Sequence, residues 1–197
     1  AQISTFKREQ VEIVTGVPIP PDWTTFWKQA AQQGFKPKIA SVGKALLFPR
    51  SVEALGDLGE GMSTEVWWTP RHPFKSSLTG ASAADLAAAY TRDTKKQWTQ
   101  PLGFTHALFE VAVDALKRSA SFDDKAAVVA AIKATNLNTV VGPISWAKGP
   151  VPNVTKTPLV GGQWVRGKEF RFDVVVVSNQ AASNIPVSGK LRPIGQA

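Results

Sequence analysis

The sequence contains no cysteine. This absence excludes disulfide bonds, zinc–thiolate sites, iron–sulfur clusters and cysteine nucleophiles, although it does not identify a cellular compartment. The two histidines, His72 and His106, leave little room for a metal site built from several imidazoles. We therefore expect no metal and no cofactor.

Long apolar runs are also missing. No stretch approaches the roughly 20 consecutive apolar residues that a membrane-spanning helix requires. Polar or charged residues (Gln2, Ser4, Lys7 and Arg8) occupy the region where a signal peptide would carry its apolar core. The sequence predicts neither a membrane span nor a signal peptide within this chain.

Positive charge is in excess, but the basic residues are not clustered in the sequence. Lys and Arg number 23 against 15 Asp and Glu, a formal net charge of +8. Such an excess favours an anionic partner, for example nucleic acid, a phospholipid surface or a small carboxylate. The basic residues nevertheless form nothing longer than doublets, such as Lys7-Arg8 and Lys95-Lys96. Nucleic acid is therefore the least favoured of these partners.

Familiar catalytic motifs are absent as well. Neither the phosphate-binding patterns GxxxxGK[ST] and GxGxxG nor the hydrolase patterns GxSxG and HExxH occur. Asp123 and Asp124 lie in the first turn of an expected helix, where the helix dipole favours carboxylates. Glu110 and Asp114, four residues apart, are interpreted as a solvated stripe, and His106 as a structural residue at a helix start. The sequence predicts no catalytic residue.

The chain of 197 residues with 43% hydrophobic residues is large enough for one domain or two small lobes. A helix–strand–helix–strand order predicts an α/β fold with a parallel sheet. Asp22 is expected to cap a helix that follows the interruption at Pro18, Pro20 and Pro21. The expected helices span 2–10, 23–33, 51–58, 81–96, 103–119 and 125–135, and the expected strands span 11–17, 38–42, 62–68, 139–146, 159–165 and 169–177.

Tryptophan is abundant, with seven residues. Its ring suits ligands with flat faces, but Trp23 and Trp27 are one helical turn apart and are more simply a core pair. Trp67 and Trp68 end a strand, so their side chains point to opposite faces.

Two polar residues are placed where ligands often dock. Gln100 lies at a helix start, which favours a carboxylate. Lys44 follows a strand, and ligands in parallel sheets bind beyond the carboxyl ends of the strands. The simpler interpretation of Lys44 is a solvated surface charge.

Several segments in order resemble one family. They are 11–16, 26–30, 56–62 (GDLGEGM), 100–108 (QPLGFTHAL), 139–146 (TVVGPISW) and 162–165 (GQWV). The chain resembles the type I periplasmic solute-binding proteins of branched-chain amino-acid-type ABC transporters, the leucine/isoleucine/valine-binding-protein-like group. This resemblance implies an α/β protein with two three-layer αβα lobes joined by a hinge, a periplasmic location, no enzymatic activity, and an ABC permease of the inner membrane as partner.

The chain has about half of the length that the resemblance implies. Residues 1–68 are then expected in lobe II, 69–138 in lobe I, and 139–197 in the C-terminal strands of lobe II and the hinge. The N-terminal part of the fold, and any signal peptide, are expected to lie outside this chain. That missing N-terminal half is either a separate chain or lost.

The same resemblance implies a ligand. Amino-acid-binding relatives carry an acidic residue after the strand that corresponds to 38–42, where this chain has Gly43-Lys44-Ala45. Tyrosines after the preceding strand are replaced by Pro18, Ile19 and Pro20. We therefore expect a small carboxylate, an aromatic or hydrophobic acid, with a branched-chain or other amino acid as the alternative and an α/β hydrolase or transferase as a second alternative. The expected ligand-binding residues are Lys44, Pro18, Ile19, Gln100, Leu102, Phe104 and Trp68.

Overall fold

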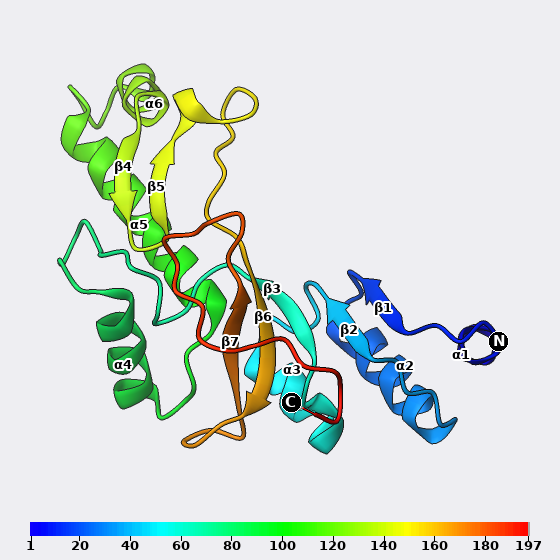
Figure 1. Cartoon of the computed structure of the whole chain (residues 1–197). Coiled ribbons are helices and arrows are strands. Elements are labelled where there is room, and N and C mark those ends of the chain that lie inside the picture. Colours follow the sequence, from blue (N-terminus) through cyan, green and yellow to red (C-terminus); the bar gives the residue numbers. More distant parts are fainter. Residues whose placement is uncertain (197) are drawn as a thin grey trace. The chain divides into compact units, whose positions relative to one another are not determined.

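A computed structural model describes residues 1–196 of the chain (Figure 1). The chain divides into two compact units: Ala1–Val66 together with the residues from Val160 onward, and Trp67–Leu159. We call them unit 1 and unit 2. Among the described residues, no helix is both long enough and apolar enough to cross a membrane.

A five-stranded sheet with the order β1-β2-β3-β6-β7 forms the centre of unit 1 (Figure 1). Its strands are β1 (Ile13–Gly16), β2 (Ile39–Val42), β3 (Ser63–Val66), β6 (Val160–Arg166) and β7 (Phe172–Ser178). β1, β2 and β3 run parallel, as the sequence predicts, whereas β6 and β7 run antiparallel to their neighbours. The expected hairpin near the C-terminus is confirmed, and it makes the sheet mixed rather than wholly parallel.

The helices of unit 1 are α1 (Gln2–Arg8), α2 (Pro20–Gln32), α3 (Pro49–Glu53) and the 3-10 turn η1 (Gly56–Gly59). Asp22 is not the cap of α2; Ile19 holds that position, and two prolines begin the helix. Proline is tolerated there because the first helical N–H groups have no partner within the helix in any case. The expectation that these prolines interrupt both regular states was wrong for this reason.

The core of unit 1 lies between α2 and one face of the sheet. Burial alternates along β2, where Ala40 and Val42 are buried, and Val14 is the buried residue of β1, whereas three of the four residues of β3 are buried. Trp23 and Trp27 stack with ring centroids 5.2 Å apart. Both indoles are buried, so the interpretation of this pair as core is confirmed.

Unit 2 contains three helices and one short hairpin (Figure 1). The helices are α4 (Ala83–Thr94), α5 (Gln100–Arg118) and α6 (Lys125–Lys133); the strands are β4 (Asn136–Thr139) and β5 (Gly142–Ser145), followed by the 3-10 turn η2 (Trp146–Lys148). The expected single strand over 139–146 is wrong, because the chain reverses at Val140 and Val141 between the two antiparallel strands. Residues 139–159, which the sequence grouped with the C-terminal strands, lie in this unit. The assignment of either unit to a lobe stays a prediction.

Side-chain caps explain where two of these helices begin. Ser82 and Asp85 form a reciprocal capping box at the start of α4. Asp124 accepts a hydrogen bond from the backbone N–H of Ala126 (2.8 Å), which caps α6 and accounts for one of the two adjacent aspartates.

Glu110 on α5 corrects one expectation. It is fully buried rather than part of a solvated stripe. Its carboxylate accepts hydrogen bonds from the backbone N–H (2.5 Å) and hydroxyl (2.8 Å) of Ser77 and from the backbone N–H of Val140 (3.0 Å). This one side chain therefore joins α5 to the preceding loop and to the β4–β5 turn.

Candidate functional site

The carboxyl ends of the three parallel strands meet at one edge of the sheet in unit 1. Ser41 of β2 stands opposite Ser63 of β3, so Gly43 and Glu65, two residues further on, face each other. The backbone N–H of Gly43 also donates to the carbonyl of Gly16 at the end of β1 (3.0 Å). We call this region the strand-end edge and define it as residues 16–19, residues 43–47 and Glu65.

Lys44 lies in a tight turn of the strand-end edge. Its backbone has a positive φ of 58°, and its side chain is exposed to solvent. The next residues, Ala45, Leu46 and Leu47, are buried, and the carbonyl of Leu46 accepts a hydrogen bond from the indole of Trp164 (3.0 Å). The buried residues that follow thus anchor this turn to the core, while the Lys44 side chain remains exposed to solvent.

Glu65 is the residue of this edge that sequence reasoning missed. Its carboxylate accepts a hydrogen bond from the backbone N–H of Lys44 (2.9 Å). A Cβ atom added to Gly43 would lie 3.2 Å from the same carboxylate oxygen. The carboxylate therefore occupies the space into which a side chain at position 43 would project. The strand register, once known, places Glu65 there, but a linear search after residue 42 does not reach it.

Pro18 and Ile19 follow β1 at the same edge. Pro18 is half-buried, while Ile19 is 44% exposed, and Val17 beside it is 73% exposed. Three of the predicted ligand-binding residues (Pro18, Ile19 and Lys44) therefore lie at the ends of adjacent parallel strands. The surface that they form is apolar beside β1 and charged beside β2.

The other four predicted residues lie in unit 2 around the start of α5. Trp68 is fully buried and donates from its indole to the carbonyl of Val140 (3.1 Å). Gln100 is also buried, and its side-chain oxygen accepts the backbone N–H of Trp67 (2.7 Å). Leu102 and Phe104 are partly buried against the same core cluster. The structure thus brings these four residues together in a packing role, and their role toward a ligand stays a prediction.

One serine–histidine contact occurs in unit 2. The hydroxyl of Ser76 lies 2.7 Å from Nε2 of His106. The same oxygen accepts hydrogen bonds from the backbone N–H groups of Leu78 and Thr79, each 3.2 Å away, and Ser76 is 4% exposed. A hydroxyl whose lone pairs are committed to a turn is a poor nucleophile, so the contact supports the structural interpretation of His106.

The second histidine is buried in the loop before α4. Nδ1 of His72 contacts the backbone N–H of Thr69 (3.0 Å), whereas Nε2 is buried without a partner. Burial lowers the pKa of His72 to about 4, because the imidazolium form loses its hydration. Within residues 1–196, no group of three His, Asp or Glu side chains is arranged to hold a metal ion.

The chain is similar to known proteins in sequence and in fold. The sequence profile of a family described as periplasmic binding protein matches residues 1–168. No curated protein matches the sequence significantly.

Solved structures show the same fold. A leucine-binding protein from Thermotoga maritima matches with a TM-score of 0.70 and 20% identity over 91% of this chain and 48% of its own. A leucine-, isoleucine-, valine-, threonine- and alanine-binding protein from Brucella ovis matches with a TM-score of 0.69 and 15% identity, over 98% of this chain and 50% of its own. The substrate-binding protein of a branched-chain amino acid transporter from Streptococcus pneumoniae, solved with isoleucine, matches with a TM-score of 0.65 and 12% identity, over 90% of this chain and 47% of its own. The chain therefore spans about half the length of the structures that it matches.

Proposed function

The chain belongs to the periplasmic binding protein family, and from this premise we propose that it is part of the solute-binding component of an ABC importer. In this proposal the protein acts in the periplasm, binds a small organic carboxylate, and delivers it to an inner-membrane permease. It performs no chemistry on that ligand. The Ser76–His106 pair supports this last point, since its hydroxyl is engaged in a turn.

The observation that carries the proposal is the position of Lys44. Its ammonium is exposed at the carboxyl end of a parallel strand, on a turn that buried neighbours hold in place. Ligands of open parallel sheets dock at such ends. An ammonium there can form a charge-assisted hydrogen bond to a carboxylate, which is about twice as strong as a neutral one.

The neighbouring apolar residues support a hydrophobic ligand body. Val17 and Ile19 leave apolar surface exposed at the end of β1, beside the half-buried Pro18. Burial of such surface against a ring or a branched alkyl group stabilises a complex by about 25 cal/mol per Å². We therefore propose an aromatic or otherwise hydrophobic acid as the ligand.

Glu65 favours a second candidate, a hydrophobic amino acid. The carboxylate of Glu65 accepts the backbone N–H of Lys44, so the strand-end edge carries one negative and one positive side chain on neighbouring strands. That pair of charges complements an α-ammonium and an α-carboxylate. Two of the similar structures are of proteins named for binding leucine, and a third was solved with isoleucine, which supports the same candidate.

Titration calorimetry with matched ligands tests both candidates. We would compare 3-phenylpropionate with phenylalanine, and 4-methylpentanoate with leucine, since each pair differs by one ammonium group. Lys44→Ala is expected to weaken every ligand by about tenfold through loss of one charge-assisted hydrogen bond, whereas Lys28→Ala, an exposed lysine on α2 away from the edge, leaves affinity unchanged. Equal affinities for the Lys44→Ala and unmodified chains would overturn the role of Lys44.

Glu65→Gln separates the two candidates. If the Glu65 carboxylate binds the α-ammonium of an amino acid, this change weakens phenylalanine and leucine by about tenfold and does not weaken the two matched acids, which lack that group. If the ligand is a simple acid and Glu65 makes no contact with an ammonium group, the change weakens neither member of a pair. A steep loss of affinity with added salt would instead indicate binding to a polyanion such as nucleic acid.

A further inference from the structure

The strand-end edge contains a lysine in a backbone conformation that lysine rarely adopts. The φ of Lys44 is 58°, in the left-handed region, which is unfavourable for a residue with a Cβ atom. Such conformations persist only where surrounding groups hold them, and they cluster at functional sites. The backbone conformation of a residue also sets the direction of its Cα–Cβ bond. Whatever holds this φ therefore determines where the Lys44 side chain begins.

Glu65 holds the turn from the neighbouring strand β3. Its Oε1 accepts the backbone N–H of Lys44 at 2.9 Å, across 21 positions of the sequence. The strand register places Glu65 beside the turn, because Ser41 of β2 stands opposite Ser63 of β3. A hydrogen bond to an ionised acceptor is about twice as strong as one between neutral groups. The carboxylate thus ties the left-handed residue to the sheet.

Gly43 leaves room for this carboxylate. The three heavy atoms nearest to a Cβ built on Gly43 all belong to Glu65, at 3.2, 3.4 and 3.7 Å. Gly43 is not among the residues with a positive φ, so the left-handed region is not the reason for glycine at this position. A side chain here would instead displace the Glu65 carboxylate. The glycine and the glutamate therefore act as a pair.

We propose that Glu65 is a positioning residue for carboxylate binding: it fixes the turn that presents the Lys44 side chain, and Gly43 keeps its place open. This inference rests on the proposed function, since it takes Lys44 as the group that binds the ligand carboxylate. It applies to both candidate ligands, because both carry a carboxylate. Glu65 raises the affinity for that group without touching it.

The binding test compares two changes at position 65 in titration calorimetry. Its probe is 3-phenylpropionate, which has no ammonium group. Glu65→Ala removes the acceptor of the Lys44 N–H and is expected to weaken binding about tenfold, whereas Glu65→Gln keeps an acceptor oxygen and restores most of the affinity. In a Lys44→Ala chain, Glu65→Ala should cause no further loss, because no ammonium remains to be positioned. Equal losses in the alanine and glutamine variants, or a full tenfold loss in the Lys44→Ala chain, would overturn the inference.

A measurement without ligand keeps this inference separate from the proposed function. In NMR spectra, exchange of the Lys44 amide is expected to rise about tenfold in Glu65→Ala and in Gly43→Ala, while the amides of β6 and β7 stay unchanged. Gly43→Ala should add nothing in a Glu65→Ala chain, where the space is empty. Gly16→Ala is the matched control at the same edge, since its Cβ would meet only Pro18 at an ordinary 3.7 Å.

The two measurements fail in different ways. Unchanged exchange of the Lys44 amide in Glu65→Ala overturns the positioning role, and the calorimetric test of Lys44 is then unaffected. If no chain binds 3-phenylpropionate or the amino acids, the proposed function fails, and the exchange measurement still decides whether Glu65 holds the turn.

Discussion

Individual buried polar side chains determine how the segments of unit 2 pack against one another. Glu110 binds three donors from two other segments, Gln100 accepts from Trp67, and Trp68 donates to Val140. Because each of these groups is buried, loss of one partner leaves the other without water to replace it. Residues of this kind fix how the loop, helix and hairpin meet, which generic apolar packing does not do.

Replacement of Glu110 by glutamine is expected to destabilise the chain by about 2–3 kcal/mol. The amide has one acceptor oxygen, so its NH₂ group must face a donor, either Ser77 or Val140. Urea denaturation measures the loss. Asp114→Asn, in which a partly exposed ion pair with Arg118 is removed from the same helix, should cost less than about 1 kcal/mol. Similar losses in both variants would contradict this account of Glu110.

His72 predicts how stability depends on pH. Its pKa is about 4 in the folded chain against an ordinary 6.5. The unfolded chain therefore binds more protons between these values, and stability falls as pH falls through this range. From about pH 7.5 to about pH 5 the loss attributable to His72 is about 2 kcal/mol. Urea titrations at both pH values should show a loss smaller by that amount in His72→Gln, and an unchanged pH dependence in this variant would count against the buried imidazole as its cause.

The start of α5 requires a residue without a side chain at position 103. A Cβ atom on Gly103 would lie 2.5 Å from the Trp68 indole. Gly103→Ala is therefore expected to destabilise the chain by more than about 1 kcal/mol, although alanine is the better helix former by about that amount. Thermal unfolding would show this loss, and Thr105→Ala, an exposed position on the same helix, should be neutral or slightly stabilising. A Gly103→Ala chain more stable than the unmodified one would contradict this prediction and would mean that the Trp68 indole shifts at little cost in free energy.

Elements were predictable from sequence where local chemistry decides them. β1–β3 and the β6–β7 hairpin follow from β-branched runs and turns, and the helix expected over 81–96 follows from its alanine-rich composition. The start of α2 was misplaced because prolines end regular structure in most positions but not in the first turn of a helix. The reversal at Val140 has no Gly or Asn at its centre, so a run of apolar residues looked like one strand.

The candidate site was predictable only in part for a related reason. Lys44 follows a strand in sequence, so a linear search finds it. Glu65 reaches the same place from the neighbouring strand, and Trp68 turns inward into the core, facts that depend on register and packing. Neighbours across a sheet are set by which strands pair, which no single segment encodes.

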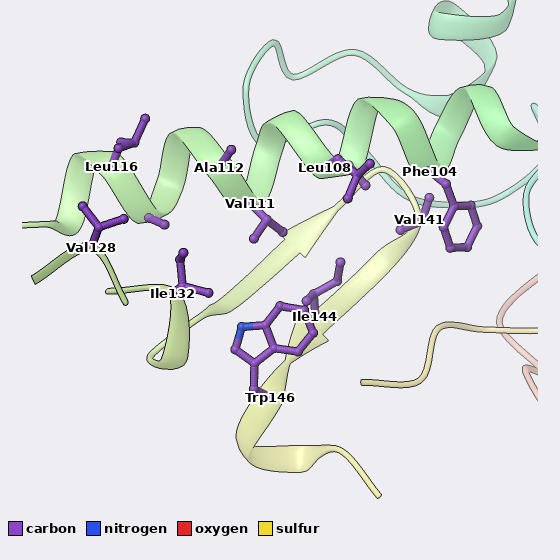
Figure 2. A pocket seen from close by; sticks show the side chains of 12 residues that line it. Phe104, Leu108, Val111, Ala112, Leu116, Val128, Ile132, Val141, Ile144 and Trp146 are labelled. Carbon is purple, nitrogen blue, oxygen red and sulfur yellow. The ribbon is translucent and has the colours of Figure 1, made fainter. Parts of the chain in front are cut away.

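At the scale of the whole molecule, the two units differ in how completely each can bury its own apolar surface. Unit 1 has a five-stranded sheet, whereas unit 2 has a two-stranded one and an open apolar groove lined by α5, α6 and the β4–β5 hairpin (Figure 2). Three or more strands are usually needed for a sheet to be stable by itself. Unit 2 should therefore be the less stable unit in this chain.

Hydrogen exchange of the intact chain can resolve the two units. Glu110→Gln removes an interaction within unit 2, and Trp164→Phe removes the indole hydrogen bond to Leu46 within unit 1. If each unit opens separately, a loss of about 2 kcal/mol raises exchange about 30-fold in the altered unit and leaves the other unchanged. The unmodified chain should show slower exchange in β6 and β7 than in α5, because the larger sheet closes more apolar area. A uniform rise across both units in either variant would mean that the chain unfolds as one cooperative body, and would contradict the separate opening of the two units.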